Sequence, residues 1–206
     1  MCGATRDARR RMRIASGLLL AVAVAGGGAE ATSPEHPHIP AGAYAIDKSH
    51  ASLVAVVSVL GGVAHYRLGF PVLGGAFAYD PSNWRRTTAR IVVDPRSPDI
   101  ARSPVRREMT RYFEPDRYPI ITFVSHALTG EDVRGTMSGD LTLHGVSRPV
   151  TLHVTLDPLD PGRPGLGTRV RFSGTGHISR SDFGMKGGPI AGDKVALAFT
   201  VEFVRR

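Results

Sequence analysis

The chain has almost no cysteine and very little lysine. Its one cysteine is Cys2, so residues 32–206 contain no thiol. Disulfides, cysteine-ligated metals and thiol catalysis are therefore excluded for that part of the chain. A domain without these supports has to be stabilised by its apolar core, and about 175 residues are enough to bury one.

Positive charge is in excess, but it is not gathered into a block. The chain has 26 Lys and Arg against 18 Asp and Glu, and without residues 1–31 the excess falls to five. Only three of the basic residues are lysine, and the arginines are scattered along the sequence. Nucleic-acid binding is typical of a clustered basic face with interleaved aromatic residues. We therefore expect no nucleic-acid partner.

Sequence motifs for catalysis and metal binding are also missing. The chain has no G-x-S-x-G elbow, no phosphate loop ending in Gly-Lys-Ser/Thr and no H-E-x-x-H helix motif. Its eight histidines are dispersed, and His36 and His38 lie in a Pro-rich stretch. We expect no catalytic residue, no cofactor and no built metal site.

Residues 1–31 have the pattern of a secretory signal peptide. Five arginines precede an apolar run, residues 14–25, which is shorter than the about 20 residues of a membrane-spanning helix. Ala29-Glu30-Ala31 fits a cleavage site, so we expect a periplasmic or secreted protein. An uncleaved anchor is the alternative, and the choice between the general and twin-arginine routes stays open. Residues 32–41 are Pro-rich without periodicity, which predicts a linker before a domain at 42–206.

Residues 139–156 carry the clearest structural signal. Leu141 and Leu143 alternate with polar residues, and Val150, Leu152 and Val154 do so after a break that contains Gly and Pro. Alternation of period two with β-branched residues predicts antiparallel strands with one buried face, joined as a hairpin. We interpret His144 and Gly145 as turn residues rather than as ligands, with Gly145 able to supply positive φ.

Strand patterns recur along the rest of the chain. They lie at 44–47, 52–59, 65–79, 90–93, 120–128, 133–143, 150–156, 168–178 and 194–204. Pro71 and Gly74-Gly75 predict a bulge or bend inside the third of these. Ser103-Pro104 begins one short amphipathic helix that ends at Glu114-Pro115. Eight or nine sequential strands without a βαβ rhythm predict an all-β barrel or sandwich.

Several of these stretches, in this order, resemble the YceI-like family of polyisoprenoid-binding, lipocalin-like barrels. The similarity covers about residues 43–204. The stretches that carry it are 46–52, 66–70 with 79–81, 109–113 with 118–125, 139–150, 178–185 and 195–203. Many family members have a histidine in the second strand, and Val57 to Gly61 has none here. The resemblance implies an eight-stranded antiparallel barrel with a short helical insertion.

The same resemblance implies an apolar pocket for an isoprenoid lipid such as a quinone or polyprenyl lipid, held as a carrier or reservoir. The expected pocket lining consists of phenylalanines, with ordinary core packing as the alternative for each: Phe70, Phe77, Phe113, Phe123, Phe172, Phe183 and Phe199. Arg180 and Asp182 are candidates for contacting the ligand head group, with a purely structural role in the loop as the alternative. Small residues among these strands should leave the volume for a ligand, namely Ala76, Ala78, Gly174, Gly176, Ala196 and Ala198.

Two other functions stay open at this point. One is an enzyme of the barrel class acting on an apolar substrate through His65, His126 or Asp182. The other is an envelope stress or interaction protein that uses the arginines of the predicted helix, such as Arg106 and Arg111. We expect a monomer or homodimer with transient contact to a membrane surface.

Overall fold

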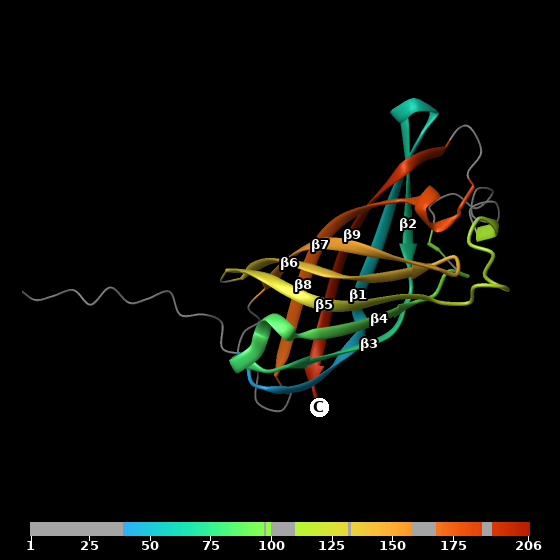
Figure 1. The fold of residues 1–206 in the computed structure, drawn as a ribbon. Coiled ribbons are helices and arrows are strands. Elements are labelled where there is room, and N and C mark those ends of the chain that lie inside the picture. The colour runs from blue at the N-terminus through green and yellow to red at the C-terminus, as the bar shows by residue number, and fades with distance from the viewer. Residues whose placement is uncertain (1–38, 97, 100–109, 132, 158–167, 187–190) are drawn as a thin grey trace, which may run out of the picture. The chain divides into compact units, whose positions relative to one another are not determined.

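Nine antiparallel strands make up most of the computed structural model, which describes residues 39–96, 98–99, 110–131, 133–157, 168–186 and 191–206 (Figure 1). All of these belong to one unit, Glu35–Arg206. The strands are β1 (Gly42–Val59), β2 (Ala64–Phe70), β3 (Val72–Tyr79), β4 (Thr88–Val93), β5 (Ile121–Glu131), β6 (Arg134–Leu143), β7 (Val146–Asp157), β8 (Arg169–Ser179) and β9 (Ala191–Arg205). The predicted signal peptide 1–31, the linker up to residue 38 and most of the predicted helix lie outside the described residues.

Eight of the strands close into a barrel. β1, β3, β4, β5, β6, β7, β8 and β9 follow one another around the ring, and β9 pairs with β1 along most of its length. Every ladder is antiparallel, and side chains alternate between the interior and the outer face. The predicted all-β barrel is confirmed.

β1 is long enough to pair with two strands on one edge. Its first residues pair with β3, and Leu53 to Val59 pair with β2. The break between β2 and β3 falls at Pro71, which has no N–H for a ladder, and a register shift follows between Val72 and Gly74. The bend predicted in this run is thus present. The far edge of β2 makes a single described bridge, Gly69 with Asp99.

The β6–β7 hairpin turns on two residues. Leu143 pairs with Val146, while His144 and Gly145 between them both have positive φ, 52° and 75°. This is the geometry of a two-residue hairpin loop, which matches the twist of the flanking strands. Pro149 belongs to β7 rather than to the turn, and it stands opposite Asp140 on the part of β7 that pairs with β6 alone.

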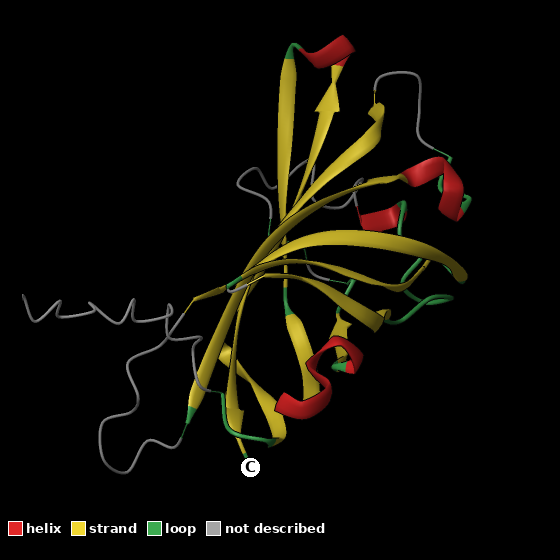
Figure 2. Ribbon diagram, turned by 60° about the vertical axis from the view of Figure 1, so that its left-hand side comes forward, coloured by secondary structure: helices red, strands yellow, loops and turns green. Residues whose placement is uncertain are grey.

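The two ends of the barrel are filled differently. At the end where β1 begins, Tyr44 stacks on Phe77 at 4.5 Å, and Phe203 meets Phe77 edge-on at 4.8 Å. Their side chains close this end with a solid aromatic core. At the other end lie the β1–β2 hairpin with its one-turn 3-10 helix η1 (Leu60–Gly62) and the 3-10 helix η3 (Arg180–Phe183) (Figure 2).

Helix is scarce in the part of the chain that the structure describes. Thr110 and Arg111 form the described end of the predicted amphipathic helix, and Glu114, with φ of 43°, ends it as the sequence predicts. η2 (Pro81–Arg86) connects β3 to β4, with Asp80 accepting a hydrogen bond from the Ser82 N–H at 2.9 Å. No described helix is long and apolar enough to cross a membrane.

Candidate functional site

A cavity of about 400 Å³ occupies the half of the barrel that the aromatic core leaves unfilled. Leu53, Ala55, Val57 and Val59 of β1 form one wall, and the inward residues of β2 form the next. The rest of the wall comes from Val93 of β4, the inward faces of β5 to β9, Tyr112 with Phe113, and Arg180 with Met185. The volume lies at the lower end of the range for ligand pockets.

The cavity wall is almost entirely apolar. Among its described lining residues, only Arg180 carries a charge, and only Tyr66 and Tyr112 add hydroxyl groups. No described lining residue is a histidine or a carboxylate. Such a wall favours an apolar ligand, because each Å² of apolar surface removed from water contributes about 25 cal/mol to the free energy of binding.

The described end of the predicted helix contributes to the cavity wall. Phe113 lines the cavity and meets Phe70 edge-on at 5.4 Å. The segment is fixed to the β6–β7 hairpin, because His144 Nε2 lies 3.1 Å from Glu114 Oε1 and the His144 ring lies 4.4 Å from that of Tyr118. His144 therefore acts as a turn residue with a packing contact, and no sequence pattern indicates its partners.

The structure separates the seven predicted phenylalanines into three groups. Phe70, Phe113, Phe123 and Phe199 line the cavity. Phe77 and Phe172 lie in the aromatic core at the closed end, where their rings contact each other and that of Phe203. Phe183 is 1% exposed and packs in the core beside Leu143 and Met185 rather than on the cavity wall.

The small residues expected to leave room for a ligand do not do so. Ala76, Ala78 and Ala198 are exposed on the outer face, as the register of β3 and β9 requires, and Ala196 shares that face. Gly174 and Gly176 do face inward, but the ring of Phe199 and the side chain of Leu152 cover them. The open volume lies instead between larger aliphatic side chains and beside Ala55 and Ala191.

Arg180 joins η3 to the start of β9. Its guanidinium donates to the carbonyl oxygens of Gly192 at 3.0 Å, Met185 at 2.8 Å and Ala191 at 2.8 Å, while its side chain borders the cavity. Asp182 is exposed and lies outside the described lining, and its backbone oxygen accepts from Arg148 Nε at 3.1 Å. The two predicted head-group residues are therefore not brought together at the cavity.

The residues considered for catalysis are spread over the outer surface. His65 is exposed on β2, and His126 is exposed on β5, where its Nε2 lies 2.7 Å from Asp140 Oδ2. Neither belongs to the described lining of the cavity, and neither does Asp182. The structure brings no two of these three together.

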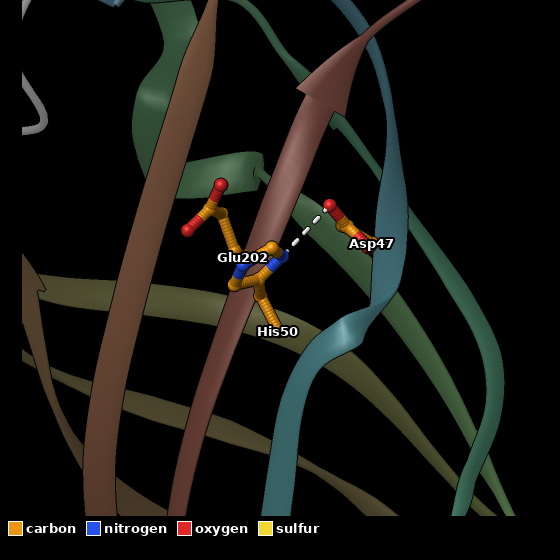
Figure 3. Close-up of side chains that lie close together, drawn as sticks. All are labelled: Asp47, His50 and Glu202. Atoms are coloured by element: carbon orange, nitrogen blue, oxygen red, sulfur yellow. Dashed lines mark hydrogen bonds and ion pairs between the residues drawn. The ribbon is translucent and has the colours of Figure 1, made fainter.

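A polar cluster that the sequence does not predict lies on the outer face of the barrel. Asp47, His50 and Glu202 hold potential ligand atoms within 4.8 Å of one another (Figure 3). His50 is placed there by a bulge of β1 between Asp47 and Ala51, and Glu202 is 3% exposed. No sequence pattern indicates this cluster, because the cross-strand pair of Arg171 and Glu202 becomes visible only once the register is known.

Two arginines donate hydrogen bonds to the carboxylates of this cluster. Arg169 Nη1 bridges Asp47 Oδ2, at 3.1 Å, and Glu202 Oε1, while Arg171 Nη2 lies 3.0 Å from Glu202 Oε2. Burial alone would raise the pKa of Glu202, but the hydrogen bonds from Arg169 and Arg171 outweigh it and hold the pKa below its ordinary value. Two guanidinium groups against the carboxylates disfavour a cation here, so we interpret the cluster as an ion-pair network.

Hydrogen bonds also set the ionisation of Asp47. Those from Ser49, then His50, and then Arg169 hold the pKa of Asp47 far below its usual range. Asp47 therefore remains charged under all but strongly acidic conditions.

Comparison with known proteins agrees with this architecture. The model of a family described as the YceI-like domain matches residues 44–203. A UPF0312 protein of Pseudomonas putida is 30% identical over 171 residues, covering 79% of this chain and 86% of that protein. A UPF0312 protein of Vibrio vulnificus is 31% identical over 146 residues, covering 68% and 76%.

Two solved structures share the fold. Burkholderia cenocepacia BcnA superposes with a TM-score of 0.64 and 23% identity over 76% of this chain and 98% of that one. A polyisoprenoid binding domain from Saccharophagus degradans, implicated in plant cell wall breakdown, gives a TM-score of 0.62 and 20% identity over 79% and 98%. With a family match that spans most of the barrel and relatives of this similarity, the chain belongs to the YceI-like domain family.

Proposed function

We propose that this protein binds an amphiphilic isoprenoid lipid in the barrel cavity and serves as its carrier or reservoir. The observation that carries the proposal is the cavity of about 400 Å³, whose described lining residues are apolar apart from Arg180 and two tyrosines. A quinone or a polyprenyl lipid fits this chemistry, since its tail is apolar and its head is small. The printed description of the Saccharophagus degradans domain as polyisoprenoid binding supports the same ligand class.

The cavity chemistry also favours binding over catalysis. General acid–base catalysis needs a titratable group within hydrogen-bond reach of the substrate. His65, His126 and Asp182 lie outside the described cavity wall. A protein that only stores or moves a ligand needs none of these groups, and we assign no catalytic residue.

An exported protein suits this role. The signal pattern of residues 1–31 supports export to the periplasm or out of the cell, where a lipid tail needs shelter from water. We propose a monomer or a homodimer as the working state.

Lipid analysis of the protein purified from its own cell envelope tests the proposal. Native mass spectrometry should show a bound species, and solvent extraction should release an isoprenoid lipid. Ala55→Phe places a ring in the cavity and should lower the bound fraction about tenfold or more, because the ring takes the volume of the tail.

The control is Ala198→Phe, which makes the same change on the outer face of β9, the strand that pairs with β1 beside Ala55. It should keep the lipid. A wild-type protein that yields no extractable lipid and takes up no added isoprenoid quinone would contradict the proposal, as would equal loss in both variants.

A further inference from the structure

The tip of the β1–β2 hairpin exposes apolar side chains to solvent. Leu60 is 57% exposed and Val63 is 85% exposed, and only Gly61 and Gly62 lie between them. Leu60, with φ of 53°, is held in the left-handed region that a branched side chain rarely adopts. The turn thus exposes apolar side chains, and its backbone at Leu60 is strained.

This tip is continuous with the cavity. Val59, one residue before it, is 4% exposed and lines the cavity, as do Val57 and Tyr66 lower on the hairpin. The hairpin stands out beyond the other strands at this end of the barrel (Figure 1, Figure 2). An apolar surface therefore leads from the exposed turn along the inner face of β1 into the cavity.

The charges of the hairpin favour an anionic partner. The paired hairpin, residues 53–70, contains one arginine, Arg67, and no Asp or Glu. Arg67 is exposed on the outer face of β2. On the part of β9 near Val59, the exposed acid Asp193 is followed by the exposed Lys194, so these two charges offset each other.

We propose that the turn Leu60–Val63 inserts into the surface of an anionic phospholipid bilayer and so places the cavity where its ligand resides. A protein surface binds such an interface through shallow apolar insertion combined with basic residues that meet the head groups. The proposal rests on the lipid-binding function proposed above, because only a membrane-dissolved ligand needs this contact. Leu60 and Val63 supply the insertion, and Arg67 supplies the attraction.

Flotation with vesicles tests the insertion. The full protein should float with mixed phosphatidylcholine and phosphatidylglycerol vesicles, less with phosphatidylcholine alone, and less again at high salt. The double variant Leu60→Ser/Val63→Ser should bind the mixed vesicles about tenfold less or weaker still, because two exposed apolar side chains are lost. Leu73→Ser is the matched control, since Leu73 is 40% exposed on β3 away from the turn.

A fluorescence measurement shows which end of the barrel meets the bilayer. The one tryptophan, Trp84, lies in η2 next to the opposite end of β1, so brominated lipids should not quench it. Val63→Trp in a Trp84→Phe background should shift its emission to the blue and be quenched. Quenching of Trp84 in the wild type, or none at position 63, would overturn the proposal.

Ligand uptake separates this proposal from the function on which it rests. The double variant should bind an isoprenoid quinone added from ethanol as the wild type does, but take it up from vesicles more slowly. If neither protein binds the quinone while vesicle binding persists, the proposed function fails and the membrane contact stands. If the double variant floats like the wild type, the proposed membrane contact is wrong. The same holds if the two substitutions alter only the oligomeric state of the protein.

Discussion

Inward-facing glycines of β8 set how closely the neighbouring strand packs. A Cβ on Gly174 would stand 2.4 Å from Phe199 Cζ and 2.6 Å from the backbone oxygen of His153. The ring of Phe199 therefore lies flat on β8 and still borders the cavity. The glycine is needed for this close approach and not for an unusual φ.

Gly174→Ala should lower the free energy of unfolding by about 1–3 kcal/mol, because the backbone oxygen cannot move aside and the ring must enter the cavity. Denaturant unfolding measures the change. Gly74→Ala is the control, since nothing lies within 4 Å of the Cβ that it would add. Equal stability of the two variants would contradict the packing described here.

The ion-pair network on the outer face makes the free energy of unfolding depend on pH in the acidic range. Asp47 and Glu202 both have folded-state pKa values below the ordinary ones. A carboxylate with a depressed folded pKa contributes stability that is complete above its unfolded pKa, about 4, and is lost as the pH falls through the folded pKa. The midpoint of denaturant unfolding should therefore fall as the pH drops below about 4.

Glu202→Gln should remove part of this dependence and lower stability at neutral pH by about 1–3 kcal/mol, because the hydrogen bonds of two arginines lose a charged acceptor. Asp140→Asn, in the exposed pair with His126, serves as a control and should cost less than about 1 kcal/mol. A steep acid transition retained in the Gln variant would show that other groups carry it.

Among the elements, η3 depends on one side chain for its position. Arg180 donates to the carbonyl oxygen of Met185 after η3 and to those of Ala191 and Gly192 at the start of β9, and Gly184 ends η3 with φ of 69°. The same guanidinium borders the cavity. A structural role and a contact with a ligand head group are therefore compatible at this position.

Arg180→Lys separates the two roles. An ammonium group cannot reach three separate carbonyls in the geometry of a guanidinium, so unfolding stability should fall by about 1–3 kcal/mol. If Arg180 also contacts the head group, the affinity for an isoprenoid quinone should fall relative to Arg148→Lys, a control on β7 that bonds Asp182 from outside the cavity. Equal quinone affinity in the two variants would assign Arg180 to structure alone.

Element positions could largely be predicted from the sequence, because alternation reports directly which face of a strand is buried. Leu141, Leu143, Val150 and Leu152 all line the cavity as their spacing predicts. The predicted side-chain orientation was wrong where alternation is weak. Ala76 and Ala198 look like cavity residues by size, but they face outward. Alanine is compatible with either face, so only the register decides.

Over the whole barrel, aromatic packing and open volume lie at opposite ends. Phe77 and Phe172 fill one end and the cavity takes the other, a division that no local pattern encodes because it depends on where strands converge. The cluster of Asp47, His50 and Glu202 was missed for the same reason, since β1 and β9 are far apart in the chain.

Removing the ligand should destabilise the barrel as a unit. A ligand that binds only the folded state adds about 2.7 kcal/mol when present at a hundred times its dissociation constant. Protein stripped of lipid by refolding from denaturant should therefore melt at a lower temperature, and added isoprenoid quinone should restore the melting temperature. Ala55→Phe should melt alike with and without the quinone, whereas Ala198→Phe should respond as the wild type does.

The pairing of β1 with β9 also determines when the barrel closes during folding. The ladder between them joins residues such as Tyr44 and Arg205, so the ring stays open until nearly the entire barrel sequence is available. Contacts of such long sequence separation make folding slow. The enclosed volume is then the last feature to form, and a chain that has not yet closed has no place to hold a lipid. Under the lipid-binding function proposed above, loading therefore follows closure of the barrel.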